Sequence, residues 1–204
     1  MRTPTRRVYV KKEPFRDAIL FLIICEGEKR EPQYFEFFDG LSTRIKVYPV
    51  PNVSEASAPN HLLQNAEIAT NTFDLKETDE LWFVLDIDSW HGHINNLQSI
   101  CKKKRNWNIA LSNPCFEVWL FFHILDNIDL IQDKNQCTNW RQVIPTILNG
   151  GFNSKKHPAL IGTAISNASS KYSETGYLPN VGSTQVFKLG QKIYPFIEEA
   201  LKSI

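Results

Sequence analysis

Two carboxylates, one residue apart, end the most apolar stretch of the chain. Residues 81–85 are five consecutive apolar residues, and Asp86 and Asp88 follow them. Such a run predicts a strand buried on both faces. Side chains alternate along a strand, so the two carboxylates should point to the same side, about 6–7 Å apart. They would repel each other unless a cation lay between them or one were protonated. Alternatively, Asp88 or Ser89 caps the next helix and Asp86 forms hydrogen bonds of its own.

Two further acidic positions lie close to the ends of other predicted strands. Residues 18–24 form the second strongly apolar run, and Glu26 follows it in a turn that also contains Glu28. Glu117 lies in an almost entirely apolar helix after the fourth predicted strand. An unpaired carboxylate in such a helix is costly. Glu26 could instead cap the next helix, and Glu117 could form a structural hydrogen bond to the Glu26 loop.

These acids are expected to converge on one metal site. The carboxyl ends of parallel strands lie at the edge of the sheet where open α/β proteins bind ligands, and neighbouring strands are about 4.8 Å apart. Carboxylate oxygens without paired soft ligands favour Mg²⁺ or Mn²⁺ over zinc. Such ions, when held by carboxylates, typically act on phosphates. The predicted metal ligands are Glu26, Asp86, Asp88 and Glu117.

The elements that must position these residues follow a strand–helix repeat. Four strands separated by helices predict an α/β fold, with a four-stranded parallel sheet flanked by helices. The predicted strands cover residues 18–24, 44–50, 81–88 and 108–112, and the helices between them cover 32–41, 60–73 and 89–104. After Ser112 the chain is predicted to be helical apart from loops, with helices over 115–125, 138–148, 158–172 and 183–201.

Length and composition are those of an ordinary globular chain. The 204 residues suit a basic arm (1–17), an α/β core (18–125) and a helical extension packed on it (126–204). A net charge of +1 gives no global signal for nucleic acid. The four cysteines form no C-x-x-C pair, which favours reduced thiols in a cytosol. No apolar run is long enough to span a membrane, and no secretory signal is recognised. A cytoplasmic protein is expected.

Several other reactive side chains are interpreted as structural. Cys25 and Cys115 flank the predicted site but have no obvious activating base, so packing is the simpler role. His123 is expected to be a core histidine with satisfied hydrogen bonds. His91 and His93 open a predicted helix and are expected to lie on the surface, although their spacing also has metal-ligand character.

Three segments of the chain carry a resemblance to a known family. They are residues 25–35 (CEGEKREPQYF), 86–88 (DID) and 112–120 (SNPCFEVWL), with a weaker match near residues 182–186. Together they resemble the RloB-like family, with its AbiL-type abortive-infection proteins, which are bacterial accessory proteins of restriction and phage-defence loci. The segments span most of the chain, and the Ser-Asn-Pro-x-Phe-Glu-x-Trp pattern is the most specific of them.

The resemblance implies a fold and a set of catalytic residues. The family looks like a branch of the Toprim superfamily, whose fold is a four-stranded parallel sheet with helices. In Toprim enzymes, a glutamate after the first strand and an Asp-x-Asp after the third support Mg²⁺-dependent chemistry at phosphodiesters. The resemblance therefore implies that Glu26 is a general acid/base or metal ligand. Asp86 and Asp88 would be metal ligands, and Glu117 would be a further ligand or would orient one.

The resemblance also implies a nuclease, because the chain lacks the extra domain of a topoisomerase and the zinc module of a primase. Such a nuclease would act on RNA or DNA in phage defence, with a partner ATPase, and could be latent without that partner. Lys29, Arg30, Asn113 and Lys155 are the expected substrate-binding residues, although Lys155 lies in a basic loop that could simply be solvated. The alternative is a non-catalytic subunit that binds a nucleotide or a partner. A phosphotransferase fits less well, because no phosphate-cradling glycine loop is present.

Overall fold

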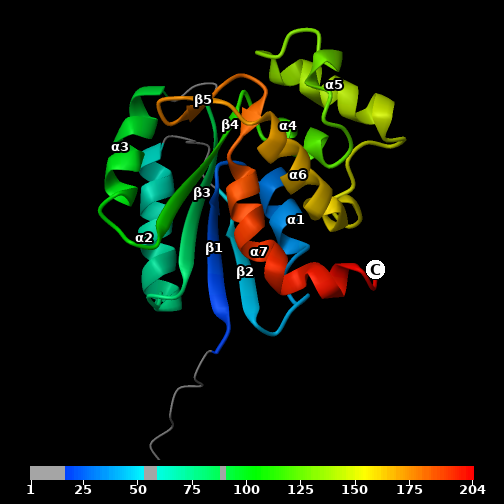
Figure 1. Cartoon of the computed structure of the whole chain (residues 1–204). Helices are drawn as coiled ribbons and strands as arrows, with labels where there is room; N and C mark the ends of the chain where they lie inside the picture. The colour runs from blue at the N-terminus through cyan, green and yellow to red at the C-terminus, as the bar shows by residue number, and fades with distance from the viewer. Residues whose placement is uncertain (1–16, 53–58, 88–90) are drawn as a thin grey trace, which may run out of the picture.

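A five-stranded, mostly parallel sheet forms the centre of the molecule, and helices lie against both of its faces (Figure 1). The computed structural model describes residues 17–52, 59–87 and 91–204. Neighbouring strands of the sheet, in spatial order, are β2 (Ile45–Val50), β1 (Ile19–Cys25), β3 (Glu80–Asp86), β4 (Trp107–Asn113) and β7 (Ser183–Thr184). The first four are parallel, and β7 is antiparallel to β4. The predicted α/β class is confirmed, but the predicted count of four strands is wrong.

The two central strands are the two most apolar runs of the sequence. β1 is buried from Leu20 to Cys25, and β3 is buried from Leu81 to Leu85. The two strands pair in parallel, with Ile24 opposite Phe83. Because both faces of these strands are covered by helices, their sequences are continuously apolar rather than alternating. The bounds of the four parallel strands lie within one residue of the predicted ones, except that β3 ends at Asp86, two residues earlier than predicted.

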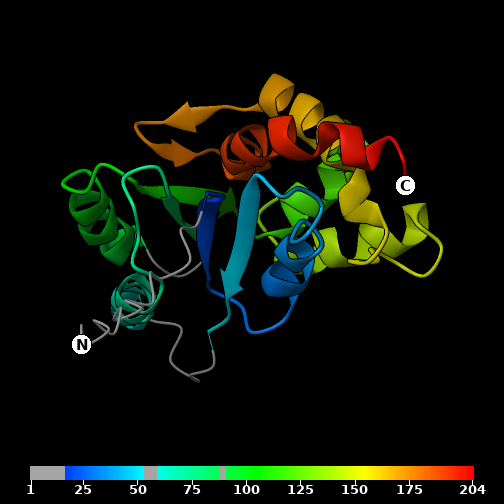
Figure 2. The same ribbon diagram turned by 90° about the horizontal axis from the view of Figure 1, so that it is seen from below.

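Alternate residues of β1 enter two separate hydrophobic cores. Leu20, Leu22 and Ile24 pack with residues of α2 (Pro59–Phe73) and α3 (His91–Cys101) on one face of the sheet. Phe21, Ile23 and Cys25 belong to the core on the other face. The helices of that second core are α1 (Arg30–Glu36), α4 (Glu117–Phe122), α5 (Cys137–Ile147), α6 (Ile161–Lys171) and α7 (Val186–Leu201). Figure 2 shows the two groups of helices on opposite sides of the sheet.

The region after Ser112 is less helical than predicted. β4 continues to Asn113, where it pairs with β7, and α4 covers only Glu117–Phe122 of the helix predicted over residues 115–125. A hairpin of two short strands, β5 (Glu174–Thr175) and β6 (Leu178–Pro179), occupies a predicted loop and its border. Short 3₁₀ turns lie at Ile128–Leu130 and His157–Leu160. The division into a core and a helical extension stays a prediction, although one hydrophobic core contains residues of both.

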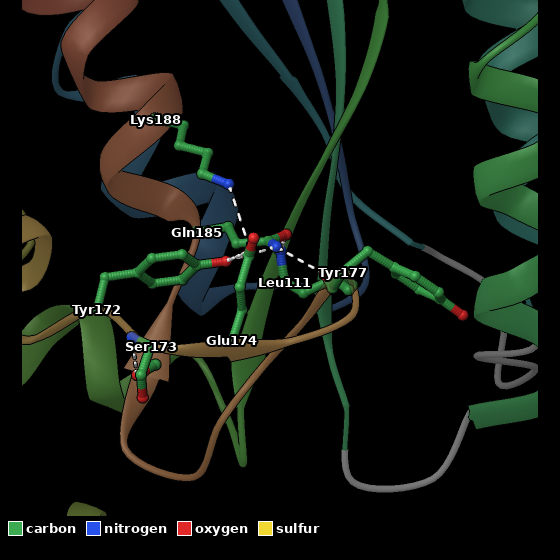
Figure 3. A network of polar contacts seen from close by, with 8 residues as sticks. Leu111, Tyr172, Ser173, Glu174, Tyr177, Gln185 and Lys188 are labelled. Carbon is green, nitrogen blue, oxygen red and sulfur yellow. Dashed lines mark hydrogen bonds and ion pairs between the residues drawn. The ribbon is translucent and has the colours of Figure 1, made fainter.

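Gln185 joins β4 to the hairpin and to α7, as Figure 3 shows. Its backbone N–H donates to the Leu111 carbonyl (2.7 Å), and its side-chain oxygen accepts from the Leu111 N–H (3.2 Å). The side-chain amide donates to the Tyr172 hydroxyl and to the Tyr177 carbonyl, both at 2.9 Å. One buried side chain thus extends the pairing of β7 and fixes the hairpin beside the sheet.

Tyr34 and His123 form the polar centre of an aromatic core beneath α1. The Tyr34 hydroxyl lies 3.1 Å from Nε2 of His123, and Nδ1 of His123 lies 3.0 Å from the Trp119 carbonyl. Tyr34 and Phe35 of α1, and Phe38 just after it, are all buried. The prediction that His123 is a satisfied core histidine is confirmed. Burial lowers the pKa of His123 to about 3, so the ring is neutral, donating to Trp119 and accepting from Tyr34.

The depressed pKa of His123 predicts that acid destabilises the protein. The folded pKa of about 3 lies below the ordinary value of 6.5, so between these pH values the unfolded state binds one more proton and stability falls as pH falls. Denaturant unfolding should show that lowering the pH from 7 to 4.5 costs the wild-type protein roughly 2–3 kcal/mol more than it costs His123→Gln. Equal pH dependence in the two proteins would contradict the assignment of a neutral buried imidazole.

No helix in the described part of the chain is long and apolar enough to cross a membrane. All four cysteines are free, and burial raises the pKa of both Cys25 and Cys115. Their thiols therefore stay protonated at neutral pH and are poor nucleophiles. This agrees with the predicted packing role of the two residues.

Candidate functional site

A cavity of about 880 Å³ opens at the carboxyl edge of the sheet. The turn after β1, the end of β3, and residues of α1, α4, α5 and the loop after α5 line it. This is the edge at which open α/β proteins place their ligands. Of the predicted site residues, Glu26, Lys29, Arg30, Asp86 and Glu117 line the cavity. Three of the predicted acids, Glu26, Asp86 and Glu117, therefore line one cavity, and their convergence on a metal ion stays a prediction.

Glu26 is held across the ends of β1 and β3. Its backbone N–H donates to the Val84 carbonyl (3.1 Å), which continues the pairing of the two strands. Its carboxylate oxygen Oε2 accepts a hydrogen bond from the backbone N–H of Asp86 at 2.8 Å. The carboxylate is therefore fixed directly beside Asp86, and it lies at the wall of the cavity. This contact ties the Glu26 side chain to the end of β3, whereas the alternative from the sequence was a cap on the next helix.

Asp88, the second member of the Asp-x-Asp pair, lies outside the described residues. His91 is the first residue of α3, but its side chain and that of His93 also lie outside the described part. Within residues 17–52, 59–87 and 91–204, no three acidic, histidine or cysteine side chains are close enough together to hold one metal ion. The metal ligand set therefore stays a prediction, and Glu26 and Asp86 are the two predicted ligands that the structure brings together.

Glu117 is paired with two arginines. Its side chain is only 3% exposed, and its Oε1 atom contacts Nη1 of Arg30 and accepts a hydrogen bond from Nε of Arg141 at 2.7 Å. The pairing explains how a carboxylate is tolerated in an otherwise apolar helix, because a buried charge is stable only when it is compensated. Arg30 directly follows the Glu26 turn, so the contact agrees with the interpretation of Glu117 as a link to that loop.

Two charged residues that line the cavity, Arg141 and Glu31, were not among the predicted site residues. Arg141 lies in α5, where one arginine in an amphipathic helix gives no signal of function. Glu31 is buried beside Gly27, where any Cβ would collide with its carboxylate. A Cβ at position 27 would therefore require the Glu31 side chain to move. Burial raises the pKa of Glu31, and the charges of Arg30 and Arg141 oppose that rise.

Of the other predicted substrate-binding residues, Lys29 lines the cavity, whereas Asn113 and Lys155 do not. The side-chain amide of Asn113 donates to the Pro179 carbonyl at 2.8 Å, which ties β4 to the hairpin. Lys155 is exposed and follows Ser154, which does line the cavity. Lys29 is exposed at the start of α1 and faces the cavity. Of these three, Lys29 is the best placed to meet a ligand.

Comparison with protein families identifies the chain. The model of the RloB-like protein family matches residues 21–193, which is most of the sequence. The chain belongs to the RloB-like family. The match covers the sheet apart from the first two residues of β1, the cavity and all of the predicted site residues, so the resemblance drawn from three short segments is confirmed. Searches of curated proteins and of solved structures found no match.

The site of this RloB-like chain combines two kinds of groups. Glu26 and Asp86 place hard oxygen donors at the strand ends, and Lys29, Arg30 and Arg141 place cations on the helices around the same cavity. Hard oxygen donors suit Mg²⁺ or Mn²⁺, and arginines suit phosphate oxygens. The arrangement can therefore accommodate a phosphate ester next to a divalent ion.

Proposed function

We propose that this RloB-like chain is a nuclease that depends on Mg²⁺ or Mn²⁺ and cleaves phosphodiester bonds of RNA or DNA. We further propose that it acts in bacterial phage defence by abortive infection, in the cytoplasm and under the control of a partner ATPase. Its sheet would be a Toprim sheet, a proposal supported by the parallel order β2-β1-β3-β4 and by a glutamate directly after β1.

The observation that carries this proposal is the hydrogen bond from the Asp86 N–H to the Glu26 carboxylate. The two acids are 60 residues apart in the sequence, yet they share one end of two neighbouring strands and face one cavity. Two acids lie together at the carboxyl edge of a parallel sheet, with cations nearby. This arrangement fits phosphoryl chemistry better than it fits a purely structural role.

The donor set fits a hard divalent ion. Glu26, Asp86 and, from the sequence, Asp88 would hold it; Oε1 of Glu117 already contacts two guanidinium groups. A bound Mg²⁺ or Mn²⁺ supplies Lewis-acid activation of water and stabilises the leaving oxygen. Glu26 would accept the proton of the attacking water. Lys29 would hold the reacting phosphodiester in place through its oxygens, and Arg30 would contact the same strand.

A second function is a non-catalytic subunit that binds a nucleotide or a partner protein in the same cavity. The pairing of Glu117 with two arginines favours it, because one of the four predicted acids is engaged in ion pairs. This subunit would use the cations of the cavity to hold phosphates, and it would require no metal ion.

Calorimetric titration with Mg²⁺ and Mn²⁺ separates the two functions. The nuclease proposal predicts that wild-type protein binds the ion and that Glu26→Gln and Asp86→Asn each weaken binding at least about tenfold, since each removes one charged ligand. Glu36→Gln, which changes an exposed carboxylate of α1 outside the cavity lining, should bind like the wild type. Absence of binding, or equal affinity in all four proteins, would favour the non-catalytic subunit.

A further inference from the structure

The two arginines on Glu117 are held side by side by a single atom. Arg30 comes from α1 and Arg141 from α5, more than a hundred residues later, and both contact Oε1 of Glu117. Like charges repel when they are brought together. The buried carboxylate overcomes that repulsion and fixes the positions of both guanidinium groups.

The pair retains unused hydrogen-bond donors. Glu117 compensates one of the two guanidinium charges, and both arginines also interact electrostatically with the buried carboxyl of Glu31. Arg141 uses only Nε on Glu117, and among the described residues neither arginine has another hydrogen-bond or ion-pair partner. Their side chains are 50% and 54% exposed, whereas Glu117 is 3% exposed. The remaining N–H groups are therefore accessible, and both residues line the cavity that Glu26 and Asp86 face.

We propose that Arg30 and Arg141, positioned by the buried carboxylate of Glu117, form a subsite that binds a backbone phosphate of a nucleic acid strand. This inference rests on the proposed function, and it assigns Glu117 a positioning role instead of a ligand role. Guanidinium groups bind phosphate oxygens through planar, paired donors. A second phosphate next to the scissile one would be held here, while the reacting phosphate lies near Glu26 and Asp86.

A purely structural ion pair is the competing explanation for the same contacts. It would link α1, α4 and α5 and leave ligand binding unaffected when one arginine is replaced. A single arginine would be enough to compensate Glu117 in that case. The two explanations therefore differ in the expected effect of an arginine replacement on binding. An assay without a divalent ion measures that binding alone, because the proposed cleavage requires the ion.

The test measures fluorescence anisotropy of labelled six-nucleotide DNA and RNA strands in chelator at low salt. Arg141→Gln and Arg30→Gln should each weaken binding about tenfold, the scale of one charge-assisted hydrogen-bonded contact, and should lower the salt slope by about 0.7. Arg141→Lys should recover part of the affinity. Arg105→Gln is the matched control, because Arg105 is exposed before β4 at the opposite edge of the sheet. Strands with an uncharged methylphosphonate backbone should show no difference between wild type and Arg141→Gln.

Two results would overturn the inference: no measurable binding by the wild-type protein, or equal affinity of Arg141→Gln and Arg105→Gln for the charged strands. The assay contains no divalent ion, so it does not depend on catalysis. Arginine-dependent binding without any cleavage would leave the subsite standing while the nuclease proposal fails. If Arg141→Gln does not fold, Arg141→Lys and Arg30→Gln give the same comparison.

Discussion

Replacing Arg30 and Arg141 together by glutamine is expected to cost about 3–5 kcal/mol of unfolding free energy, because it leaves a buried carboxylate without a cation. Each single replacement should cost about 1 kcal/mol or less, since the arginines are half-exposed and the other one still compensates Glu117. The effect of the double replacement should therefore far exceed the sum of the two single effects. Denaturant unfolding of the four proteins of this double-mutant cycle measures the difference directly.

A control removes the buried charge itself. In a Glu117→Gln background no carboxylate remains to be compensated, so the same two arginine replacements should together cost much less. Additive effects of the two arginines in the wild-type background would show that Glu117 is compensated in some other way. That result would also remove the physical basis for the positioning role of Glu117.

Glu26→Gln and Asp86→Asn are each expected to lower the cleavage rate by about 10²–10⁴-fold, the usual effect of removing a group that transfers a proton or holds an essential ion. Glutamine can still accept the hydrogen bond from the Asp86 N–H, so the fold should persist. The comparison is a cleavage time course at matched protein concentration, with melting temperature as the check on folding.

Glu36→Gln provides the charge-matched control for these two replacements. It removes an exposed carboxylate of α1 that does not line the cavity, and it should cleave like the wild type. Full activity in Glu26→Gln would exclude this residue as the group that accepts the proton. Full activity in Asp86→Asn would exclude the proposed role of the strand ends in holding the ion.

The parallel sheet could be predicted because its central strands have a recognisable sequence pattern. β1 and β3 are continuous apolar runs, a pattern that burial on both faces requires. Each is followed by an acid, and the geometry of parallel strands brings those acids to one edge. The meeting of Glu26 and Asp86 therefore follows from two local patterns and one rule of topology.

The fifth strand and the hairpin could not be predicted in the same way. β5, β6 and β7 are two residues long each, too short for any periodicity to register. β7 depends on a long-range contact, the pairing of Ser112 with Thr184, and on the side chain of Gln185. The motif near residues 182–186 was visible in the sequence, but its structural role could be recognised only from its pairing with β4.

The partners of Glu117 were also beyond reach of the sequence. The burial of this acid among apolar residues correctly indicated that its charge must be compensated. It did not indicate which residues provide the compensating charge. Arg141 is one of several charged residues on helix surfaces, and only the packing of α5 beside α4 brings it to the carboxylate. Local patterns identify a buried charge, whereas the identity of its counter-charge depends on tertiary structure.

The most direct measurement is cleavage of mixed tRNA, single-stranded DNA and plasmid by the purified wild-type protein, with Mg²⁺, with Mn²⁺ and with chelator. The proposal predicts cutting of at least one substrate with a divalent ion, its disappearance in chelator, and its loss in Glu26→Gln. If the protein cuts no substrate and also binds neither ion in calorimetry, the proposal of a metal-dependent nuclease is contradicted. That result would favour the non-catalytic subunit that binds a nucleotide or a partner protein.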